Sequence, residues 1–544
     1  MTTIGPACST CRRACRRCDR AKPACDRCVS KGVKCGGYPE KYKFCGLASR
    51  GKWRDAQLPV AKKPTRSTGR ATRRPQRLSV QCTRATPSPA FNGQPEPRSR
   101  PLDSLDLTAL PNINAVLEIS ATEGIDVSVL DEPDESLDAL LVQDRTEVLL
   151  AYYDEVICPH QIAMVTNNIE NPYRKYILPL AYEHVAPLCA ILGLSACHQG
   201  IQQGDREMLD SEAVQYRLQA IRSLASLLAK DRRSTLSEVE QAALLATIQL
   251  LILHDICETG ISSHGAHVTG SSVIGERWME EGMTTSDRGR TVFFLANLAW
   301  LDVTRSFAGP ERLCFSWTLM QAIIAAADRH FEMVNGCPRD IFLIVGYVLW
   351  SSKQCSLGIL SLGALQDVIR AGIVKLQQWN STSCEYPTTD PLWFNVAEAF
   401  RAACMLWMMR LLEPSRPAKD AKIESLVTQV LDNIAEVPVS SPLLELLVLP
   451  LFIAGADAMT KHSRYYVIFR LDEIKGRSGF ANPAPKDLLR QVWQTRDSPS
   501  TEDELNVPWM RFVSRASLQG TLPDTDSMQT FSTDLERQND YIII

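Results

Sequence analysis

The sequence predicts a mostly all-α protein built from a small N-terminal module, a disordered basic linker and a large helical domain. Apolar residues recur at helical spacing from about residue 136 to about residue 493, with few alternating stretches. Eight of the 18 cysteines lie within the first 45 residues. Residues 46–100 are rich in Arg, Lys, Pro, Ser and Thr and have almost no aliphatic runs, so they cannot bury enough apolar surface to fold.

These observations divide the chain into four segments. We expect the cysteine module over 8–38, the linker over 46–135, the helical domain over 136–495 and a flexible acidic tail over 496–544. The linker changes from basic to acidic, because residues 101–142 carry ten acidic residues and no Lys or Arg, interleaved with Leu, Ile and Val. This alternation is typical both of surfaces that dock coactivators and of plain acidic linkers, and both interpretations stay open.

Charge is distributed very unevenly along the chain, although the net charge is only −3. Residues 1–101 carry 24 Lys and Arg against 5 acidic residues, whereas the rest carries 35 against 57. A basic arm on an acidic body is typical of proteins that bind polyanions, because neutralising phosphates releases condensed counterions. The basic run over 62–77 fits either a nuclear-import signal or a solvated linker.

Three classes of protein have no support in the sequence. Residues 1–7 lack the apolar stretch of a secretory signal, so we expect a protein that stays inside the cell. The most apolar stretches, 242–253 and 443–456, are shorter than the roughly 20 residues of a membrane span, so we expect no membrane association. The sequence contains none of the catalytic or nucleotide-binding motifs G-x-S-x-G, G-x-x-x-x-G-K-[ST] and H-E-x-x-H. We therefore expect that the protein is not an enzyme.

The clustered cysteines form an internal repeat with the spacing C-x2-C-x6-C. Its first copy is followed by a second 17 residues later, and the two copies are Cys8, Cys11 and Cys18, then Cys25, Cys28 and Cys35. Ligands that are all sulfur, in a reducing compartment, favour zinc. Two identical half-sites indicate two zinc ions, which need eight zinc–sulfur bonds when six thiolates supply six. Two sulfurs must therefore bridge, and the repeat makes Cys8 and Cys25 the natural pair.

This ligand set assigns Cys11 and Cys18 to one ion and Cys28 and Cys35 to the other. Six thiolates on two zinc ions leave a charge of −2, which neighbouring cations offset: Arg12, Arg13, Arg16, Arg17, Lys31 and Lys34. A segment this short has no adequate core, so zinc supplies most of its folding free energy, on the order of 10 kcal/mol per ion. Two alternatives stay open: a ligand register that uses Cys15, and an iron–sulfur cluster, whose usual spacings are absent.

The spacing of the six cysteines, together with Cys18-Asp19, Pro23 and Gly37-Tyr38, resembles that of the fungal zinc binuclear cluster transcription factors. In that family the first helix of the module presents basic residues to the major groove of DNA, and residues 12–17 correspond to that helix. The resemblance implies a zinc-dependent, sequence-specific regulator of RNA polymerase II transcription that binds double-stranded DNA in the nucleus.

The arginines are distributed as this resemblance requires, because the first loop of the module has four and the second has none. The residues expected to contact DNA are Arg12, Arg13, Arg16, Arg17, Arg20 and Lys22. Arg12, Arg16 and Arg17 are candidates for bidentate bonds to guanine, each worth roughly 1–3 kcal/mol of discrimination. Phosphate contacts, which position the module, are expected from Arg13, Arg20, Lys22, Arg27 and Lys34.

The family commonly prefers CGG triplets, but this chain departs from the family at two positions. Ala14 and Cys15 stand where members usually carry Lys or Arg, which removes a direct base contact. Either the remaining arginines compensate or the chain binds altered or weaker sites. An alternative function is therefore a regulator with weakened base readout that acts mainly through protein partners of its helical domain.

A second resemblance covers the helical body. Residues 171–174 (NPYR), 178–181 (LPLA), 192–198 (LGLSACH) and 250–257 (LLILHDIC) resemble the fungal-specific regulatory domain that accompanies such clusters. The resemblance implies a domain that modulates activity through effectors or partners, including coactivators or the transcription machinery. An enzyme with a zinc-cluster appendage would require a reactive group of residues within 136–493, and the sequence shows none.

Two features of the helical body remain undecided. No sustained heptads follow Cys35, so a monomer and a homodimer through the helical domain are both open. A cluster of large apolar side chains fits either an unknown small-molecule effector pocket or plain core: Met405, Trp407, Met408 and Met409. The expected helices span 185–199, 212–229, 237–257, 290–305, 319–327, 340–358, 392–412 and 423–434.

Overall fold

The computed structural model describes two units of the chain, one within Met1–Asp106 and one within Leu107–Ile544. We describe each by itself. The described residues are 11, 25–33, 35, 136–163, 170–204, 206–231, 236–262, 265–280, 288–498, 506–513 and 540–541. The linker predicted over 46–135 lies outside this set.

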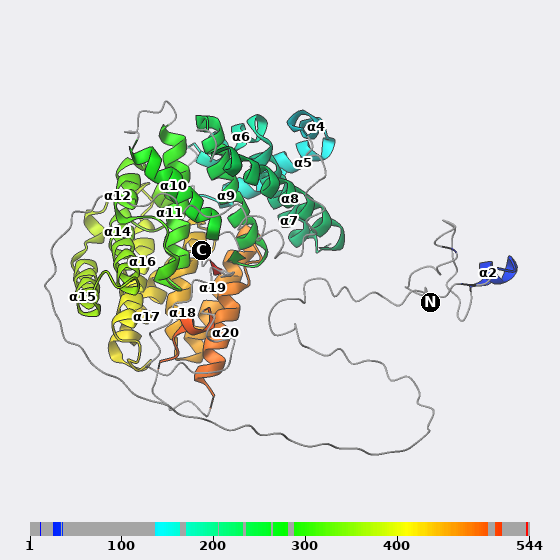
Figure 1. Ribbon diagram of the computed structural model, residues 1–544. Helices are drawn as coiled ribbons and strands as arrows, with labels where there is room; N and C mark the ends of the chain where they lie inside the picture. Colours follow the sequence, from blue (N-terminus) through cyan, green and yellow to red (C-terminus); the bar gives the residue numbers. More distant parts are fainter. Residues whose placement is uncertain are drawn as a thin grey trace, which may run out of the picture. The chain divides into compact units, whose positions relative to one another are not determined.

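The larger unit is all-α over its described residues except for two short strands, so the predicted fold class is confirmed. The strands β1 (Ile261–Ser262) and β2 (Asp540–Tyr541) pair antiparallel, with Ile261 opposite Tyr541. Labels with α denote α-helices, and labels with η denote π- and 3-10 helices (Figure 1).

The helices follow one another with short connections. The first group is α4 (Leu137–Leu141), α5 (Asp144–Tyr152), η3 (Tyr153–Ile157), η4 (Cys158–His160), η5 (Tyr173–Ile177), α6 (Leu178–Glu183), α7 (Val185–Gln203), α8 (Arg206–Asp231) and α9 (Glu238–Glu258). The second is α10 (Gly265–Glu280), α11 (Arg288–Ser306), η6 (Pro310–Arg312), α12 (Trp317–Ala326), α13 (His330–Asn335), α14 (Arg339–Ser356) and α15 (Leu362–Gln378). The last is η7 (Ser381–Ser383), α16 (Trp393–Leu412), α17 (Ala421–Ala435), η8 (Pro442–Leu447), α18 (Val448–Asp457), α19 (Lys461–Ser478), α20 (Ala484–Arg496) and η9 (Trp509–Phe512).

Helix α9 lies at the centre of the first group. Its N-terminus carries a capping box, in which the Ser237 hydroxyl accepts from the backbone of Glu240 and the Glu240 carboxylate accepts from the backbone of Ser237. Every residue from Ala242 to Cys257 is buried. A helix that is buried all round belongs to a core, and α6, α7, α8, α10 and α11 pack against it.

Helices α7 and α9 are long and apolar enough to cross a membrane by length and composition. The α9 helix contains the stretch 242–253 singled out in the sequence, whereas α7 was not singled out there. However, 78% of the α7 window and 83% of the α9 window is buried inside the domain. Neighbouring helices therefore cover both, as expected of core helices.

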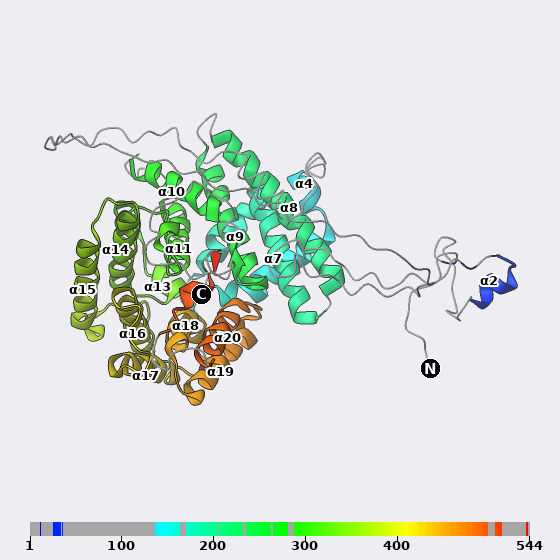
Figure 2. The same cartoon turned by 60° about the horizontal axis from the view of Figure 1, so that its bottom comes forward.

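Helices α14, α15, α16 and α17 follow one another side by side, and α18 packs on α16 and α17 (Figures 1 and 2). Helix α16 is the buried member of this group: Trp393 and Trp407 are each 2% exposed and Met408 is fully buried. Met405 is also buried, and Met409 packs against the same core. The four-residue cluster considered as an effector pocket is therefore part of the hydrophobic core.

The C-terminal helices return to the start of the domain through His198 of α7. His198 Nε2 lies 2.9 Å from the carbonyl oxygen of Ser478, and Nδ1 lies 2.9 Å from the hydroxyl of Tyr152. A carbonyl only accepts, so Nε2 donates, and Nδ1 accepts from Tyr152 in the neutral ring. Gly479 has φ +74°, and a Cβ there would lie 2.5 Å from His198 Nε2, so only glycine fits this approach.

Two described pieces of the segment expected as a flexible tail pack against the helical body. Trp509 of η9 is 7% exposed, and its ring meets Phe452 edge-on at 5.0 Å between centroids. The side-chain amide of Asn506 donates to the carbonyl of Pro414 at 3.0 Å. Strand β2 supplies the second piece.

A buried ion pair fixes the end of α11 to the chain that follows it. The Asp302 carboxylate is fully buried and accepts from Arg305 Nε at 2.9 Å and from the backbone N–H groups of Cys314 and Phe315 at 2.7 and 2.9 Å. The carboxylate thus replaces its lost hydration with three donors.

Replacing Asp302 with Ala is expected to lower the free energy of unfolding by about 3–5 kcal/mol, because it leaves the buried Arg305 charge and two backbone donors without their acceptor. Asp367→Ala is the matched control, since Asp367 forms an exposed pair with Arg370 on α15 and should cost less than about 1 kcal/mol. Urea unfolding measures both. Equal losses in the two variants would contradict this account.

The buried environment of His198 makes stability depend on pH. Desolvation lowers the pKa of His198 below its ordinary value of 6.5 in the folded state. The unfolded state therefore takes up the proton first, so the contribution of His198 is complete above about pH 6.5 and is lost as the pH falls below it. The urea midpoint should drop less between about pH 7.5 and about pH 5.5 in His198→Gln than in the unchanged chain. Identical drops would show that His198 does not control this dependence.

Candidate metal centre and nucleic-acid interface

Three sulfur atoms of the predicted repeat meet in the smaller unit. The Sγ of Cys11 lies 3.6 Å from that of Cys25 and 3.9 Å from that of Cys28, and all three atoms lie within 4.8 Å of one another. All three residues are fully buried, and Cys35 packs against them. Cys8 and Cys18 lie outside the described residues.

A short helix positions two of these sulfurs. Helix α2 (Asp26–Ser30) begins directly after Cys25, whose backbone is extended, and Cys28 lies within its first turn. The chain then turns at Gly32, where φ is +62°, and the N–H of Val33 donates to the carbonyl of Cys28 at 3.0 Å. The C-x2-C spacing thus places both sulfurs on the same side of one helical turn.

The distances fit zinc coordination. Two sulfurs bound at about 2.3 Å to one tetrahedral zinc lie about 3.8 Å apart, which is close to both measured separations. The Cys11–Cys25 distance agrees with a pair that shares an ion. Cys11 and Cys28 also lie at a distance typical of a shared ion, although the repeat assigns them to different ones, so the bridging pair stays a prediction.

Arg27 approaches this sulfur group. Its Nη1 donates to Cys11 Sγ at 3.5 Å, and this hydrogen bond is the main cause that raises the pKa of Arg27. The sequence suggested a phosphate contact for Arg27 and named other cations as the ones that offset the cluster charge. The structure brings Arg27 to a sulfur, as its position inside the second C-x2-C pair allows, and its phosphate contact stays a prediction.

Among the described residues, α2 and the turn after it present two exposed valines and one exposed lysine. Val29 is 67% exposed and Val33 is 46% exposed, and Lys31 is the exposed cation of this turn among the described residues. The residues predicted to contact DNA lie outside the described part of the chain: Arg12, Arg13, Arg16, Arg17, Arg20 and Lys22. Their contacts remain predictions.

Comparison with known families covers both units. Residues 6–44 match the fungal Zn(2)-Cys(6) binuclear cluster domain, and residues 148–522 match the fungal specific transcription factor domain. No curated protein and no solved structure matches the chain. Both resemblances drawn from the sequence are therefore confirmed, and both families are transcription-factor domains rather than enzymes. The N-terminal domain is one that binds DNA and holds two zinc ions, and the chain, more than half of which matches the second model, belongs to the fungal specific transcription factor family.

Proposed function

We propose that the chain regulates RNA polymerase II transcription in the nucleus by sequence-specific binding to duplex DNA. The observation that carries this proposal is the buried sulfur group of Cys11, Cys25 and Cys28 inside a strongly basic arm. A closed sulfur cluster has no open coordination position for a substrate, so its use is structural. The basic charge around it suits a polyanion.

The proposed architecture keeps the four segments: the zinc cluster over 8–38, a linker over 46–135, a regulatory domain over 136–495 and a tail over 496–544. The proposed zinc ligands are Cys8, Cys11, Cys18, Cys25, Cys28 and Cys35. Bound zinc would supply the folding energy that so short a segment lacks. The Arg27 side chain would then partly neutralise the thiolate of Cys11.

In this proposal the Arg-rich helix over 12–17 enters the major groove. Arginines at 12, 16 and 17 would read guanine edges, and the other cations would hold the phosphates. The helical domain would bring coactivators or the transcription machinery to the bound site. A homodimer through that domain would pair two half-sites, whereas a monomer would read one.

The zinc ligands can be tested by metal content. The purified full chain should contain two zinc ions and no iron, and Cys11→Ser should lose zinc because its sulfur lies in the cluster. Cys15→Ser is the matched control and should keep both ions. Emission spectrometry measures both, and DNA binding should vanish when zinc is chelated. Normal zinc in Cys11→Ser with loss in Cys15→Ser would establish the other ligand register, and iron would exclude zinc chemistry.

The DNA interface can be tested by selecting bound sequences from random duplexes. We expect an enriched motif related to CGG. Arg16→Ala should lose about 1–3 kcal/mol of discrimination at one base pair. Arg13→Ala should instead weaken binding to all sequences and reduce the slope of log K against log salt by about 0.9, as for one lost phosphate contact.

Each negative result of the sequence selection points to a different conclusion about DNA binding. If no motif is enriched at moderate salt, the chain acts through protein partners of the helical domain, as the loss of cationic side chains at Ala14 and Cys15 would allow. If a motif is enriched but Arg16→Ala leaves it unchanged, the helix over 12–17 is not the reading element. Repeated half-sites in the selected sequences would establish a dimer.

A further inference from the structure

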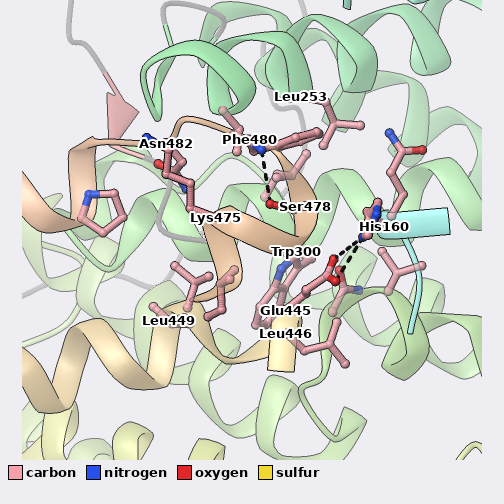
Figure 3. A pocket seen from close by; sticks show the side chains of 18 of the residues that line it. His160, Leu253, Trp300, Glu445, Leu446, Leu449, Lys475, Ser478, Phe480 and Asn482 are labelled. Carbon is pink, nitrogen blue, oxygen red and sulfur yellow. Dashed lines mark hydrogen bonds and ion pairs between the residues drawn. The ribbon is translucent and has the colours of Figure 1, made fainter. Parts of the chain in front are cut away.

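A cavity of about 160 Å³, partly open to solvent, lies in the helical body. Helices α9 and α11 line it together with η8, α18, α19 and the connection from α19 to α20 (Figure 3). His160 and Glu445 come together at one side, with His160 Nδ1 3.0 Å from a carboxylate oxygen of Glu445. The cavity therefore lies where the early and late helices of the domain meet.

Four buried amide side chains line this cavity, and each has an atom without a hydrogen-bond partner. These atoms are Gln161 Nε2, Gln249 Oε1, Asn297 Nδ2 and Asn335 Nδ2. The four residues are only 8%, 1%, 3% and 5% exposed, in that order. Buried polar atoms in proteins nearly always have partners, so four unpaired ones around a single cavity indicate that something else satisfies them.

Two of these amides are held in place by tyrosines. Gln161 accepts from the hydroxyl of Tyr153 at 3.0 Å, and Gln249 donates to the hydroxyl of Tyr173 at 3.3 Å. Each of these two amides thus uses one polar atom in a hydrogen bond to the protein, and its other polar atom has no protein partner. Because they are anchored, the amides form a preformed recognition site rather than a loose polar lining.

The rest of the cavity is apolar. Leu253, Ile256, Trp300 and Leu449 are all at most 9% exposed and line it, and Phe480 adds a ring from the α19–α20 connection. Water could form hydrogen bonds with the amides. However, a buried water needs two to four polar partners, and the apolar walls offer it none. A molecule with an oxygenated end and an apolar body satisfies both.

Size and charge narrow the class of molecule. A cavity of roughly 150 Å³ accommodates one benzene ring, so a single ring fits here. Two of the charged side chains at the cavity pair with protein groups: Glu445 also accepts from Arg477 at 2.9 Å, and Lys486 pairs with Asp472. Lys475 is exposed. The buried recognition groups are neutral amides, which match an uncharged ligand.

We propose that this cavity is a binding site for an uncharged single-ring compound that carries carbonyl or hydroxyl oxygens. The three unpaired amide N–H groups would donate to its oxygens, and Gln249 Oε1 would accept from a hydroxyl. The ring would lie against Trp300, Leu253 and Phe480. This inference goes beyond DNA binding, since it concerns the helical body alone.

The test uses the full chain, 4-hydroxyacetophenone as the probe, and toluene as the probe without oxygens. Calorimetry and thermal unfolding should show saturable binding of 4-hydroxyacetophenone in the millimolar range or tighter and a rise in Tm. Toluene should bind at least about tenfold more weakly, because it leaves the amides unpaired. No DNA is present, so failure of the DNA proposal does not affect the result.

Variants separate recognition from structure. Asn297→Leu and Asn335→Leu should each weaken probe binding at least about tenfold without lowering Tm, because each removes a polar group that the protein does not pair. Asn433→Leu, the same change outside the cavity, should leave binding unchanged. If the Asn variants do not fold, Gln249→Met, which keeps the side-chain length, takes their place.

Three outcomes overturn the proposal. The first is no saturable binding of 4-hydroxyacetophenone, which would mean that water alone satisfies the amides. The second is equal binding of toluene, which would make the site purely apolar. The third is unchanged binding in folded Asn297→Leu and Asn335→Leu, which would place the probe elsewhere.

Discussion

Helix α9 has no face that it can present to water, and the arrangement of the helical domain follows from this constraint. Since every residue from Ala242 to Cys257 is buried, other elements must cover the full circumference of the helix. Two of its polar side chains make hydrogen bonds inside the core. The Thr247 hydroxyl donates to the carbonyl of Ala243 at 2.6 Å, and Asp255 accepts from Arg217 of α8 at 2.5 Å. The surrounding helices shield α9 from water, and the cavity lies against one side of α9.

Apolar spacing predicted eight of the helices and missed others, among them the apolar α18 and several helices with a mixed pattern. All eight expected helices are present, with ends that differ by up to six residues. The prediction missed the first turns of α8, from Arg206, because these turns are mostly polar and extend no apolar pattern. Helix α19 was missed because its buried side includes Arg470, which donates to the carbonyls of Ile434 and Val437. A buried arginine interrupts an apolar pattern, and its carbonyl partners become known only in three dimensions.

The two sites differ in how far they could be predicted. Ligand spacing in the cysteine cluster follows from the chemistry of one metal and a short loop, so residue types and intervals were enough to propose it. The part played by Arg27 depends on the direction in which α2 leaves Cys25, which spacing does not specify. The cavity amides come from three helices and from the residue that follows η4, and they share no sequence motif. Their significance appears only when their unpaired atoms are seen around the same space.

The junction between the ends of the helical domain also bears on how the protein is made. Ala481 donates its N–H to the carbonyl of Cys257 at 2.8 Å, and His198 bonds to Ser478, so elements near the end of the domain complete the surroundings of helices near its beginning. During synthesis, α9 emerges from the ribosome long before the segment around residues 478–481. The nascent chain must therefore keep an apolar helix incompletely covered while the residues between α9 and this segment are synthesised, a stage at which exposed apolar surface favours aggregation.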